Sequence, residues 1–183
     1  PHLPPKNLSP GEIIANGYEI CRDLGGTPES LYRVFEVTTQ DGARALKLLQ
    51  PVRASNEQLR QRFHREHKIL EHLKDVPRVV RVYERGCWTR NGWEYHYFLM
   101  EPLGRSLRRH LQDQGGKLDW REAVQLCRQL AEGLSDCHQR LVVHRDLKPE
   151  NILFSVHDEL KLIDFGISQC SSVSGTQGDL LGT

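Results

Sequence analysis

Four polar side chains in the C-terminal part of this 183-residue chain are of the types that phosphoryl transfer requires. Asp146, Lys148 and Asn151 lie close together in the sequence, and Asp164 follows a short distance later. An aspartate can accept a proton, and a lysine can neutralise negative charge that develops in a transition state. Amide and carboxylate oxygens are ligands that Mg²⁺ prefers. The pattern therefore predicts a base, a cation and a metal site in one small volume.

These residues belong to two motifs, HRDLKPEN at 144–151 and DFG at 164–166. The pair, in this order, resembles the catalytic loop and the metal-binding motif of the protein kinase family. The resemblance covers about residues 18–183 and is to eukaryotic-type (Hanks-type) Ser/Thr protein kinases. It implies an α+β, protein-kinase-like fold whose catalytic domain is truncated within the activation segment.

The resemblance also implies a role for each of the four side chains. Asp146 would orient an acceptor hydroxyl and take its proton, and Lys148 would neutralise charge on the γ-phosphate of ATP. Asn151 and Asp164 would hold magnesium, or manganese in its place. The Lys-Pro-Glu sequence at 148–150 points to Ser or Thr acceptors on a protein substrate. The implied activity is ATP-dependent protein serine/threonine kinase activity.

The first half of the chain has the alternation of an antiparallel sheet. Residues 1–17 are rich in Pro, Gly and Asn, and predict an extended lead-in that is mobile up to about Tyr18. The expected strands are 18–24, 31–37, 43–49, 79–83 and 95–100, with hairpin turns at 40–42 and 91–92. A capping box at 55–58 predicts one helix that runs to about Leu73. We therefore expect a five-stranded N-lobe with the family's C-helix and a hinge at 18–103, and the upper part of a helical C-lobe at 104–183.

Lys47 and Glu66 predict an ion pair. A strand period of two places Ala45 and Lys47 on one face, where a small residue beside a lysine suits an adenine site with its phosphates beyond. Glu66 falls on the apolar stripe of the helix 55–73, where an unpaired carboxylate is costly. Each residue also has an ordinary interpretation without a partner: Lys47 as an exposed lysine, and Glu66 as a glutamate that reaches solvent at the edge of the apolar stripe. Together they resemble the family's strand lysine and helix glutamate, with Lys47 holding the α- and β-phosphates.

The expected nucleotide site departs most from the family at the turn 25–30. The family's phosphate loop reads G-x-G-x-x-G, whereas this turn has only Gly25 and Gly26, followed by Thr, Pro, Glu and Ser. Fewer glycines leave fewer backbone N–H groups that can approach phosphate, so the turn alone indicates an ordinary hairpin. By resemblance, the residues around ATP, including the gatekeeper at 100 and the hinge at 101–103, are Leu24, Gly25, Gly26, Leu31, Ala45, Lys47, Met100, Glu101, Leu103 and Leu153.

The second half of the chain predicts a long helix and a hairpin. A capping box at 119–122 begins a helix to about Gln139, with Cys137 expected in the core. Its expected apolar face consists of Val124, Cys127, Leu130, Ala131 and Leu134. Strands at 151–154 and 160–163 should return Asp164 to the side of Asn151. His144 and Phe165 are expected to pack, with Leu70 and Val82, into a stack that joins the lobes.

The segment from Ser168 onward is polar, and we expect it to be mobile unless it is tied down. By resemblance, Arg145 would receive a phosphate placed on a hydroxyl of this segment. The candidate hydroxyls are Ser171, Ser172, Ser174 and Thr176. The chain stops at Thr183, before the lower helices of the family. We therefore expect apolar surface that another chain, or a longer chain, would cover, and weak activity of this piece alone.

Composition narrows the classes of function and the location that the sequence allows. The chain has 25 basic and 24 acidic residues, for a formal net charge of +1, which does not indicate nucleic-acid binding. It has 5 cysteines at wide spacings, which indicate neither a disulfide framework nor a zinc site and favour a reducing, cytoplasmic location. No apolar run approaches the roughly 18 residues of a membrane span.

Two other functions remain open. The glycine-poor turn is compatible with a pseudokinase or a nucleotide-binding regulatory or scaffold module that has little transfer activity. A small-molecule phosphotransferase of related fold is the other alternative, although such enzymes usually lack the pattern of Arg145 with Lys148 and Pro149.

Overall fold

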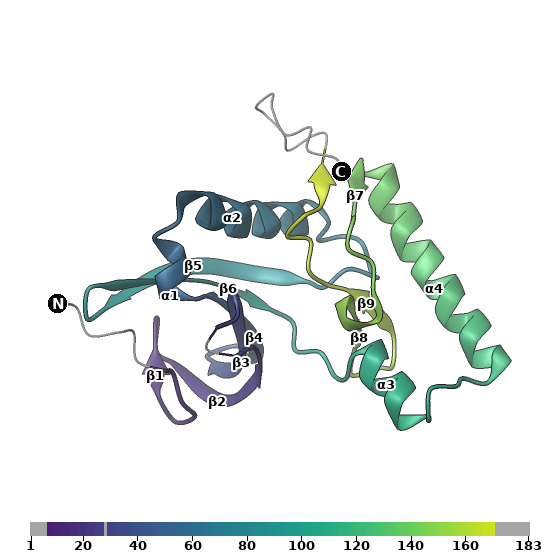
Figure 1. Cartoon of the computed structure of the whole chain (residues 1–183), viewed down its shortest axis with the longest axis horizontal. Coiled ribbons are helices and arrows are strands. Elements are labelled where there is room, and N and C mark those ends of the chain that lie inside the picture. The colour runs from purple at the N-terminus through teal and green to yellow at the C-terminus, as the bar shows by residue number, and fades with distance from the viewer. Residues whose placement is uncertain (1–6, 28, 171–183) are drawn as a thin grey trace.

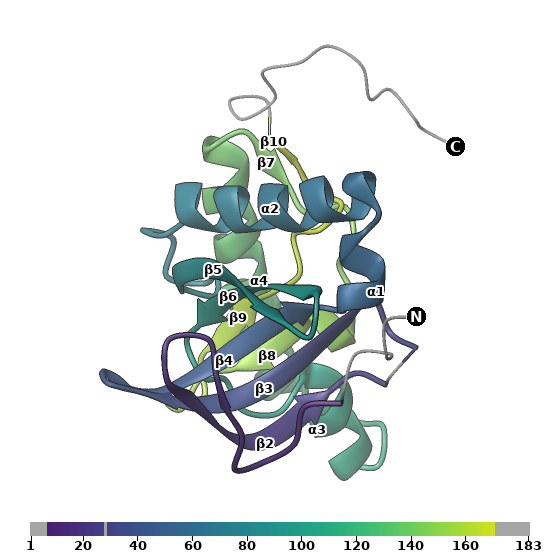
Figure 2. The same ribbon diagram turned by 90° about the vertical axis from the view of Figure 1, so that its left-hand side faces the viewer.

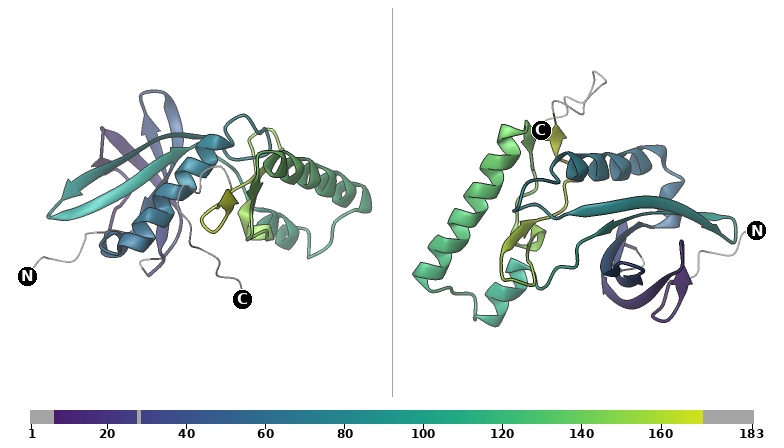
Figure 3. Two further views of the ribbon diagram at one scale, coloured as in Figure 1. Left: turned by 90° about the horizontal axis from the view of Figure 1, so that it is seen from above. Right: turned by 180° about the vertical axis from the view of Figure 1, so that it is seen from behind.

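The computed structural model describes residues 7–27 and 29–170. A curled antiparallel sheet with one long helix forms one end of the molecule, and a second long helix lies at the opposite end (Figure 1). Two views turned from this one show short hairpins between the two ends (Figure 3). This division agrees with the expected protein-kinase-like α+β fold.

The sheet runs in the order β1-β2-β3-β4-β6-β5, with every neighbouring pair antiparallel. Its strands are β1 (Ile13–Ile14), β2 (Tyr18–Gly25), β3 (Tyr32–Thr39), β4 (Gly42–Leu49), β5 (Val82–Arg90) and β6 (Trp93–Met100). The five expected strands are present. The fourth was placed wrongly at 79–83, because β5 begins at Val82 and continues to Arg90 as the partner of β6.

The expectation of a loose lead-in up to Tyr18 was wrong for its described part. Ile13 pairs with Glu19, so that β1 adds a sixth strand at the edge of the sheet. The side chains of Leu8 and Ile14 are buried in a core cluster with residues of β2 to β4 and β6. Backbone hydrogen bonds between Gly11 or Glu12 and Ile20 also hold the segment. The Pro and Gly residues around it led the composition to predict a mobile segment instead.

Helix α2 (Glu57–His72) runs across the molecule above the sheet (Figure 2). Its N-cap is Asn56, whose side-chain oxygen accepts hydrogen bonds from the backbone N–H of Gln58 at 3.0 Å and of Leu59 at 3.2 Å. The expected cap at Ser55 was therefore wrong by one residue. The Ser55 hydroxyl instead donates to the carbonyl of Val52 at 2.9 Å, at the end of the short helix α1 (Pro51–Ala54).

Replacement of Asn56 by alanine should lower the free energy of unfolding by about 1 kcal/mol, because two N–H groups of the first turn lose their acceptor. Urea unfolding followed by circular dichroism measures this change. Ser55→Ala is the matched control and should cost clearly less. An equal loss in both variants would contradict the assignment of the cap.

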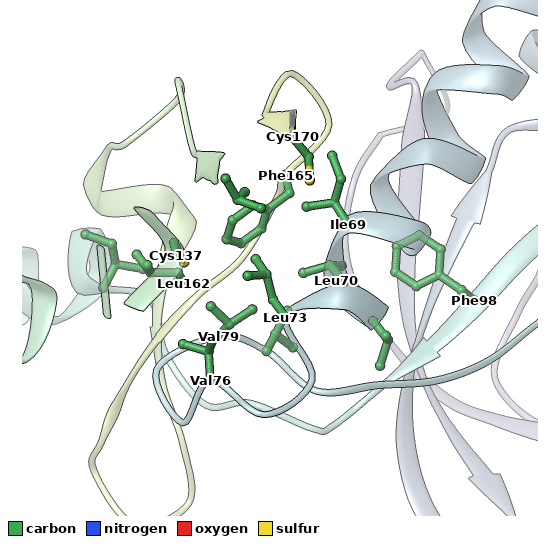
Figure 4. Close-up of a cluster of buried hydrophobic side chains, with 14 of the residues drawn as sticks. Ile69, Leu70, Leu73, Val76, Val79, Phe98, Cys137, Leu162, Phe165 and Cys170 are labelled. Carbon is green, nitrogen blue, oxygen red and sulfur yellow. The ribbon is translucent and has the colours of Figure 1, made fainter. Parts of the chain in front are cut away.

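One hydrophobic core joins the two ends of the molecule. Leu70 of α2 and Phe98 of β6 belong to the same buried cluster as Leu162 and Phe165 from the C-terminal half. Figure 4 shows Ile69 and Leu70 of α2, and Leu73 directly after it, beside Phe165. The expected stack is in place, since Val82 also lies in this cluster and the His144 ring lies 4.6 Å from that of Phe165. Helix α2 is therefore packed from both sides.

Within the described residues, the C-terminal half has two helices and two short strand pairings. Its elements are α3 (Leu107–Asp113), α4 (Trp120–Gln139), β7 (Val142–Val143), the 3₁₀ turn η1 (Pro149–Asn151), β8 (Ile152–Phe154), β9 (Leu160–Leu162) and β10 (Gln169–Cys170). Strand β8 pairs with β9 as expected, and β7 pairs with β10. The segment from Ser168 was expected to be mobile unless tied down, and residues 168–170 are tied down, since Ser168 is buried and its hydroxyl donates to the carbonyl of His144 at 2.8 Å. Residues 171–183, with the candidate phosphorylation sites, lie outside the described residues.

Helix α4 buries only part of the expected face. Leu130 and Leu134 pack against the core as expected, and Cys137 is buried, but Val124 and Cys127 are exposed and Leu126 and Gly133 are buried instead. The close approach at Gly133 explains the choice of buried face, because a Cβ there would lie 2.6 Å from the Cβ of Arg78.

The Asp119 side chain caps the helix by accepting from the N–H of Arg121 at 2.9 Å. The other half of the expected capping box was wrong, because Glu122 binds His110 at 2.6 Å instead of reaching back. None of the described helices is both long and apolar enough to cross a membrane.

Burial of histidines on α2 predicts a loss of stability in acid. Burial lowers the pKa of both His64 and His67 below that of an unfolded imidazole, about 6.5. The unfolded chain therefore takes up protons first as the pH falls, and the free energy of unfolding should decrease from about pH 6.5 downward.

Replacement of His67 by leucine should reduce this acid sensitivity, because both ring nitrogens of His67 are buried and its ring lies 5.5 Å from that of Phe98. Urea midpoints at pH 7.5 and pH 5.5 provide the measurement. His157→Gln, at the exposed β8–β9 turn, should leave the pH dependence unchanged. A midpoint in His67→Leu that depends on pH as the wild type does would exclude His67 as a source of the effect.

Candidate active site

The catalytic-loop candidates lie together as the sequence predicts. The Lys148 ammonium donates to Oδ2 of Asp146 at 2.6 Å, and Nδ2 of Asn151 donates to the same oxygen at 3.0 Å. Asn151 Nδ2 also bonds the carbonyl of Asp146 at 2.9 Å. These hydrogen bonds, that from Lys148 first, lower the pKa of the Asp146 carboxyl, so that it is ionised at neutral pH.

His144 supports this loop from inside the core. Its Nε2 bonds the carbonyl of Ile163 at 2.9 Å, and its Nδ1 accepts the backbone N–H of Asp146 at 3.3 Å. Burial lowers the pKa of His144, which favours the neutral ring that can donate at one nitrogen and accept at the other. His144 therefore fixes the backbone of Asp146, in agreement with its expected packing role.

The β8–β9 hairpin returns Asp164 to the loop. The N–H of Ile163 donates to the carbonyl of Asn151 at 3.0 Å, so that the residues before Asp164 and after the loop are joined directly. Asp164 itself has a φ of 63°, in the left-handed region that a non-glycine residue rarely adopts. Such strain persists only where surrounding contacts hold it, and it is common at functional sites.

Lys47 contacts both Glu66 and Asp164. Its ammonium lies 2.6 Å from Oε1 of Glu66 and 3.4 Å from Oδ1 of Asp164. Burial alone would lower the pKa of Lys47, but the two carboxylates raise it above its ordinary value, so that the cation is retained. Burial raises the pKa of Glu66, and the Lys47 ammonium opposes that rise. The predicted ion pair is present, and Asp164 extends it across the two ends of the molecule.

The expected adenine side of the site has the required residues in the required order. Ala45 of β4 lies opposite Met100 of β6 in the sheet register. Beyond Met100, the hinge is held by the N–H of Glu101, which donates to the carbonyl of Arg81 at 2.9 Å. None of the described residues hydrogen-bonds the N–H of Leu103, which is the donor expected to face adenine. Leu153 lies on β8, in a bridge with Ser106.

The turn after β2 is closed by its own hydrogen bonds. The N–H of Gly25 donates to Oδ1 of Asp23 at 3.0 Å, and the N–H of Thr27 donates to the hydroxyl of Ser30 at 2.8 Å. Gly26 has a φ of 97°, and a Cβ there would lie 2.5 Å from the carbonyl oxygen of Tyr32. The turn itself therefore requires a glycine at position 26. The N–H groups of Gly25 and Thr27, which a phosphate would need, already donate to nearby side chains.

Two of the expected nucleotide contacts flank the turn after β2. Leu24 of β2 is 40% exposed, and Leu31, just before β3, packs against the main core. Val34 of β3 lies directly opposite Lys47, in the position that a roof residue for adenine would take. Sequence reasoning did not name Val34, although the two-residue alternation of the strand was a sufficient signal.

Arg62 is a second residue that sequence reasoning did not identify. Its Nε donates to the carbonyl of Gly166 at 2.8 Å and so connects α2 to the DFG motif. The contact joins residues 104 positions apart, and an arginine on the exposed side of a helix gives no signal of it. Arg145 also binds this region, through a hydrogen bond to the side chain of Gln169.

The donor set fits a magnesium ion. Both amide-nitrogen bonds of Asn151 go to Asp146, which leaves its side-chain oxygen as the atom available to a cation. The Asp164 carboxylate is partly exposed and supplies anionic oxygen. Hard oxygen donors suit Mg²⁺, which keeps several waters and substrate phosphate oxygens in its shell. Within 7–27 and 29–170, no group of three or more His, Cys, Asp or Glu side chains has a metal-binding arrangement of its own.

Comparison with known proteins agrees with this geometry. A family model described as "Protein kinase domain" matches residues 18–183. The chain is 31% identical over 163 residues to serine/threonine-protein kinase PrkC of Bacillus subtilis, which covers 88% of this chain and 24% of PrkC. It is 37% identical over 169 residues to serine/threonine-protein kinase PknD of Mycobacterium tuberculosis, with 91% and 24% covered. It is 28% identical over 166 residues to Aurora kinase C of Mus musculus, with 91% and 58% covered.

The chain thus spans about a quarter of the length of the two bacterial relatives. The family match, by contrast, covers nearly all of the chain, including the sheet, α2, the catalytic loop and the DFG motif. The chain belongs to the protein kinase family, in its Hanks-type branch.

Proposed function

We propose that the chain binds ATP and transfers its γ-phosphoryl group to a Ser or Thr hydroxyl of a protein substrate. One observation carries this proposal: Lys47 of the sheet contacts Asp164, which the β8–β9 hairpin places next to the cluster of Asp146, Lys148 and Asn151. A phosphate-binding cation, metal ligands and a base then lie around one site. The similarity to PrkC and PknD supports Ser or Thr as the acceptor.

In this proposal the chain's own groups position the reactants. Asp146 accepts a hydrogen bond from the acceptor hydroxyl and takes up its proton, because its carboxyl is ionised. Lys148, which is partly exposed beside Asp146, stabilises the negative charge of the transferring group. Lys47 binds the α- and β-phosphates, while Glu66 holds its ammonium in place. Asn151 and Asp164 would hold magnesium, which neutralises phosphate charge when bound.

Adenine would lie between β3 and β4 on one side and Leu153 on the other. Ala45 and Val34 would form the roof, and the hinge at 101–103 would supply backbone hydrogen bonds. We accordingly divide the chain into a lead-in (1–17), an N-lobe with hinge (18–103) and a partial C-lobe (104–183). The five cysteines form no disulfide among the described residues, which supports a reducing, cytoplasmic setting for the protein.

Transfer can be tested with γ-labelled ATP and a mixed peptide pool that carries Ser, Thr or Tyr as the acceptor. We expect label on Ser and Thr peptides with Mg²⁺ or Mn²⁺ and none after addition of EDTA. Mass spectrometry of the chain itself would detect self-phosphorylation. Label on Tyr alone, or transfer that is insensitive to EDTA, would contradict the proposal.

A nucleotide-binding module with little transfer activity is the second candidate. The engaged N–H groups of Gly25 and Thr27 favour it, because they reduce the donors that the turn can offer to phosphate. A thermal shift on addition of ATP, combined with no label transfer by the complete protein, would support this function over the first.

Exposed apolar side chains on α4, β7, the catalytic loop and the residues next to them, including the residue after the DFG motif, support a contact with another chain. They do not form part of the core described above, and they are Trp120, Val124, Leu141, Val143, Leu147 and Ile167. We propose that further polypeptide covers this surface and that the 183-residue chain alone associates and transfers phosphate slowly. Sedimentation velocity tests this directly, and a monodisperse, fully active monomer would contradict it.

A further inference from the structure

The ring of Tyr32 lies against the ammonium of Lys47. Tyr32 begins β3, two residues before Val34, so that it lies on the same face of the sheet as Lys47. The Lys47 nitrogen is 4.5 Å from the centre of the Tyr32 ring. A cation is attracted by the face of an aromatic ring, and the attraction grows where water is excluded, as it is around Lys47.

The same ring also contacts helix α2. Tyr32 stacks on Phe63, with ring centres 5.6 Å apart and an angle of 28° between the planes. Phe63 in turn packs on Phe98 at 5.0 Å, and Phe98 lies opposite Lys47 in the sheet. The neighbours of the Lys47 ammonium are therefore the Glu66 carboxylate and a group of three packed aromatic rings, one each from β3, α2 and β6.

The hydroxyl of Tyr32 contributes little to this arrangement. It is buried and has no hydrogen-bond partner among the described residues. Burial raises the pKa of Tyr32, so that the side chain is neutral. The ring is therefore the part of the side chain that acts on Lys47, and a phenylalanine should serve equally well.

We propose that Tyr32 is a positioning residue for Lys47, and that its ring holds the ammonium against Glu66 and connects it to α2 through Phe63. The importance of this role for phosphoryl transfer rests on the proposed function. Its effect on Lys47 itself does not, because the contact joins two side chains of the chain and involves no phosphate group. The turn at 25–30 offers few N–H donors to phosphate. Binding of phosphate at this site therefore depends more strongly on a fixed Lys47 ammonium.

The reactivity of Lys47 tests the proposal. An amine-reactive acetylating reagent modifies only the neutral amine, and mass spectrometry of the full chain gives the rate at Lys47 as a function of pH. In Tyr32→Leu we expect labelling about threefold to tenfold faster at a fixed pH, because the ammonium loses its contact with the ring. Tyr32→Phe should label at the wild-type rate.

Tyr95→Leu is the matched control. Tyr95 is a buried tyrosine that stacks on Trp88 at 4.7 Å in the other core cluster, and its loss should leave the labelling of Lys47 unchanged. If Tyr32→Leu does not fold by circular dichroism, Tyr32→Met replaces it, since methionine has a similar length and no ring. In a transfer assay, the Leu or Met variant should raise KM for ATP, and the Phe variant should restore it.

Wild-type labelling in the variant without a ring would overturn the proposal. Fast labelling in Tyr32→Phe would also overturn it, because the hydroxyl would then be the active part. Absence of transfer by the wild type and all variants would count against the proposed function alone, since the labelling result does not depend on transfer.

Discussion

Replacement of Asp146 by asparagine should lower the rate of phosphoryl transfer by about 10²- to 10⁴-fold, the usual contribution of a positioned base. An amide has the same shape but cannot take up the proton of the acceptor hydroxyl. It also gives Lys148 no charge to pair with at 2.6 Å, so the ammonium loses its fixed position. Initial rates with saturating ATP and a Ser peptide measure the effect.

The affinity for nucleotide should change little in this variant, because Lys47 and Asp164 remain in place. Asp158→Asn is the matched control. Asp158 has a φ of 56° in the exposed β8–β9 turn, a conformation that asparagine tolerates, and its replacement should leave the rate unchanged. If Asp146→Asn retained more than a tenth of the wild-type rate, Asp146 would not be the base.

Breaking the Lys47–Glu66 pair should destabilise the fold more than any other single substitution discussed above. The exposed fraction of the residue is 7% for Lys47 and 1% for Glu66, so a Glu66 left alone is an uncompensated buried charge, whereas a Lys47 left alone keeps the Asp164 carboxylate at 3.4 Å. Lys47→Met should therefore lower the free energy of unfolding by about 3–5 kcal/mol, and Glu66→Met should lower it by less. Urea unfolding at pH 7.5 measures each loss.

The double variant Lys47→Met/Glu66→Met separates stability from function. Two apolar side chains of similar volume remove both charges, so unfolding stability should return close to the wild-type value or exceed it. Transfer should remain absent, because no cation is left to bind the phosphates. A double variant as unstable as the sum of the single variants would show that the two charges do not interact. An active double variant would exclude Lys47 from the chemistry.

Local patterns were enough to predict the catalytic cluster. Asp146, Lys148 and Asn151 are close in sequence, and the hairpin that follows them is a short-range structure with its own turn signal. One hydrogen bond between Asn151 and Ile163 completes the arrangement. Lys47 and Glu66 are further apart, but a carboxylate on an apolar stripe requires a partner, and the resemblance to the kinase family points to Lys47.

Other features could not be read from local patterns, because they depend on which surfaces meet. Helix α4 carries apolar residues on more than one side, and its contact with Arg78 decides that Leu126 and Cys137 are buried while Val124 is exposed. The attachment of the lead-in through Ile14 likewise depends on the core cluster that receives it.

The sequence by itself therefore determined the family, the antiparallel sheet of the first half and the chemical groups of the site, since these follow from residue types at short separations. Only the tertiary structure decided how the groups are held. Tyr32 against Lys47, Arg62 on Gly166 and the bonded turn N–H of Gly25 are contacts of side chains whose types are ordinary. The role of each side chain depends on its position in three dimensions, because the packing of distant segments determines how deeply it is buried and which charged groups surround it.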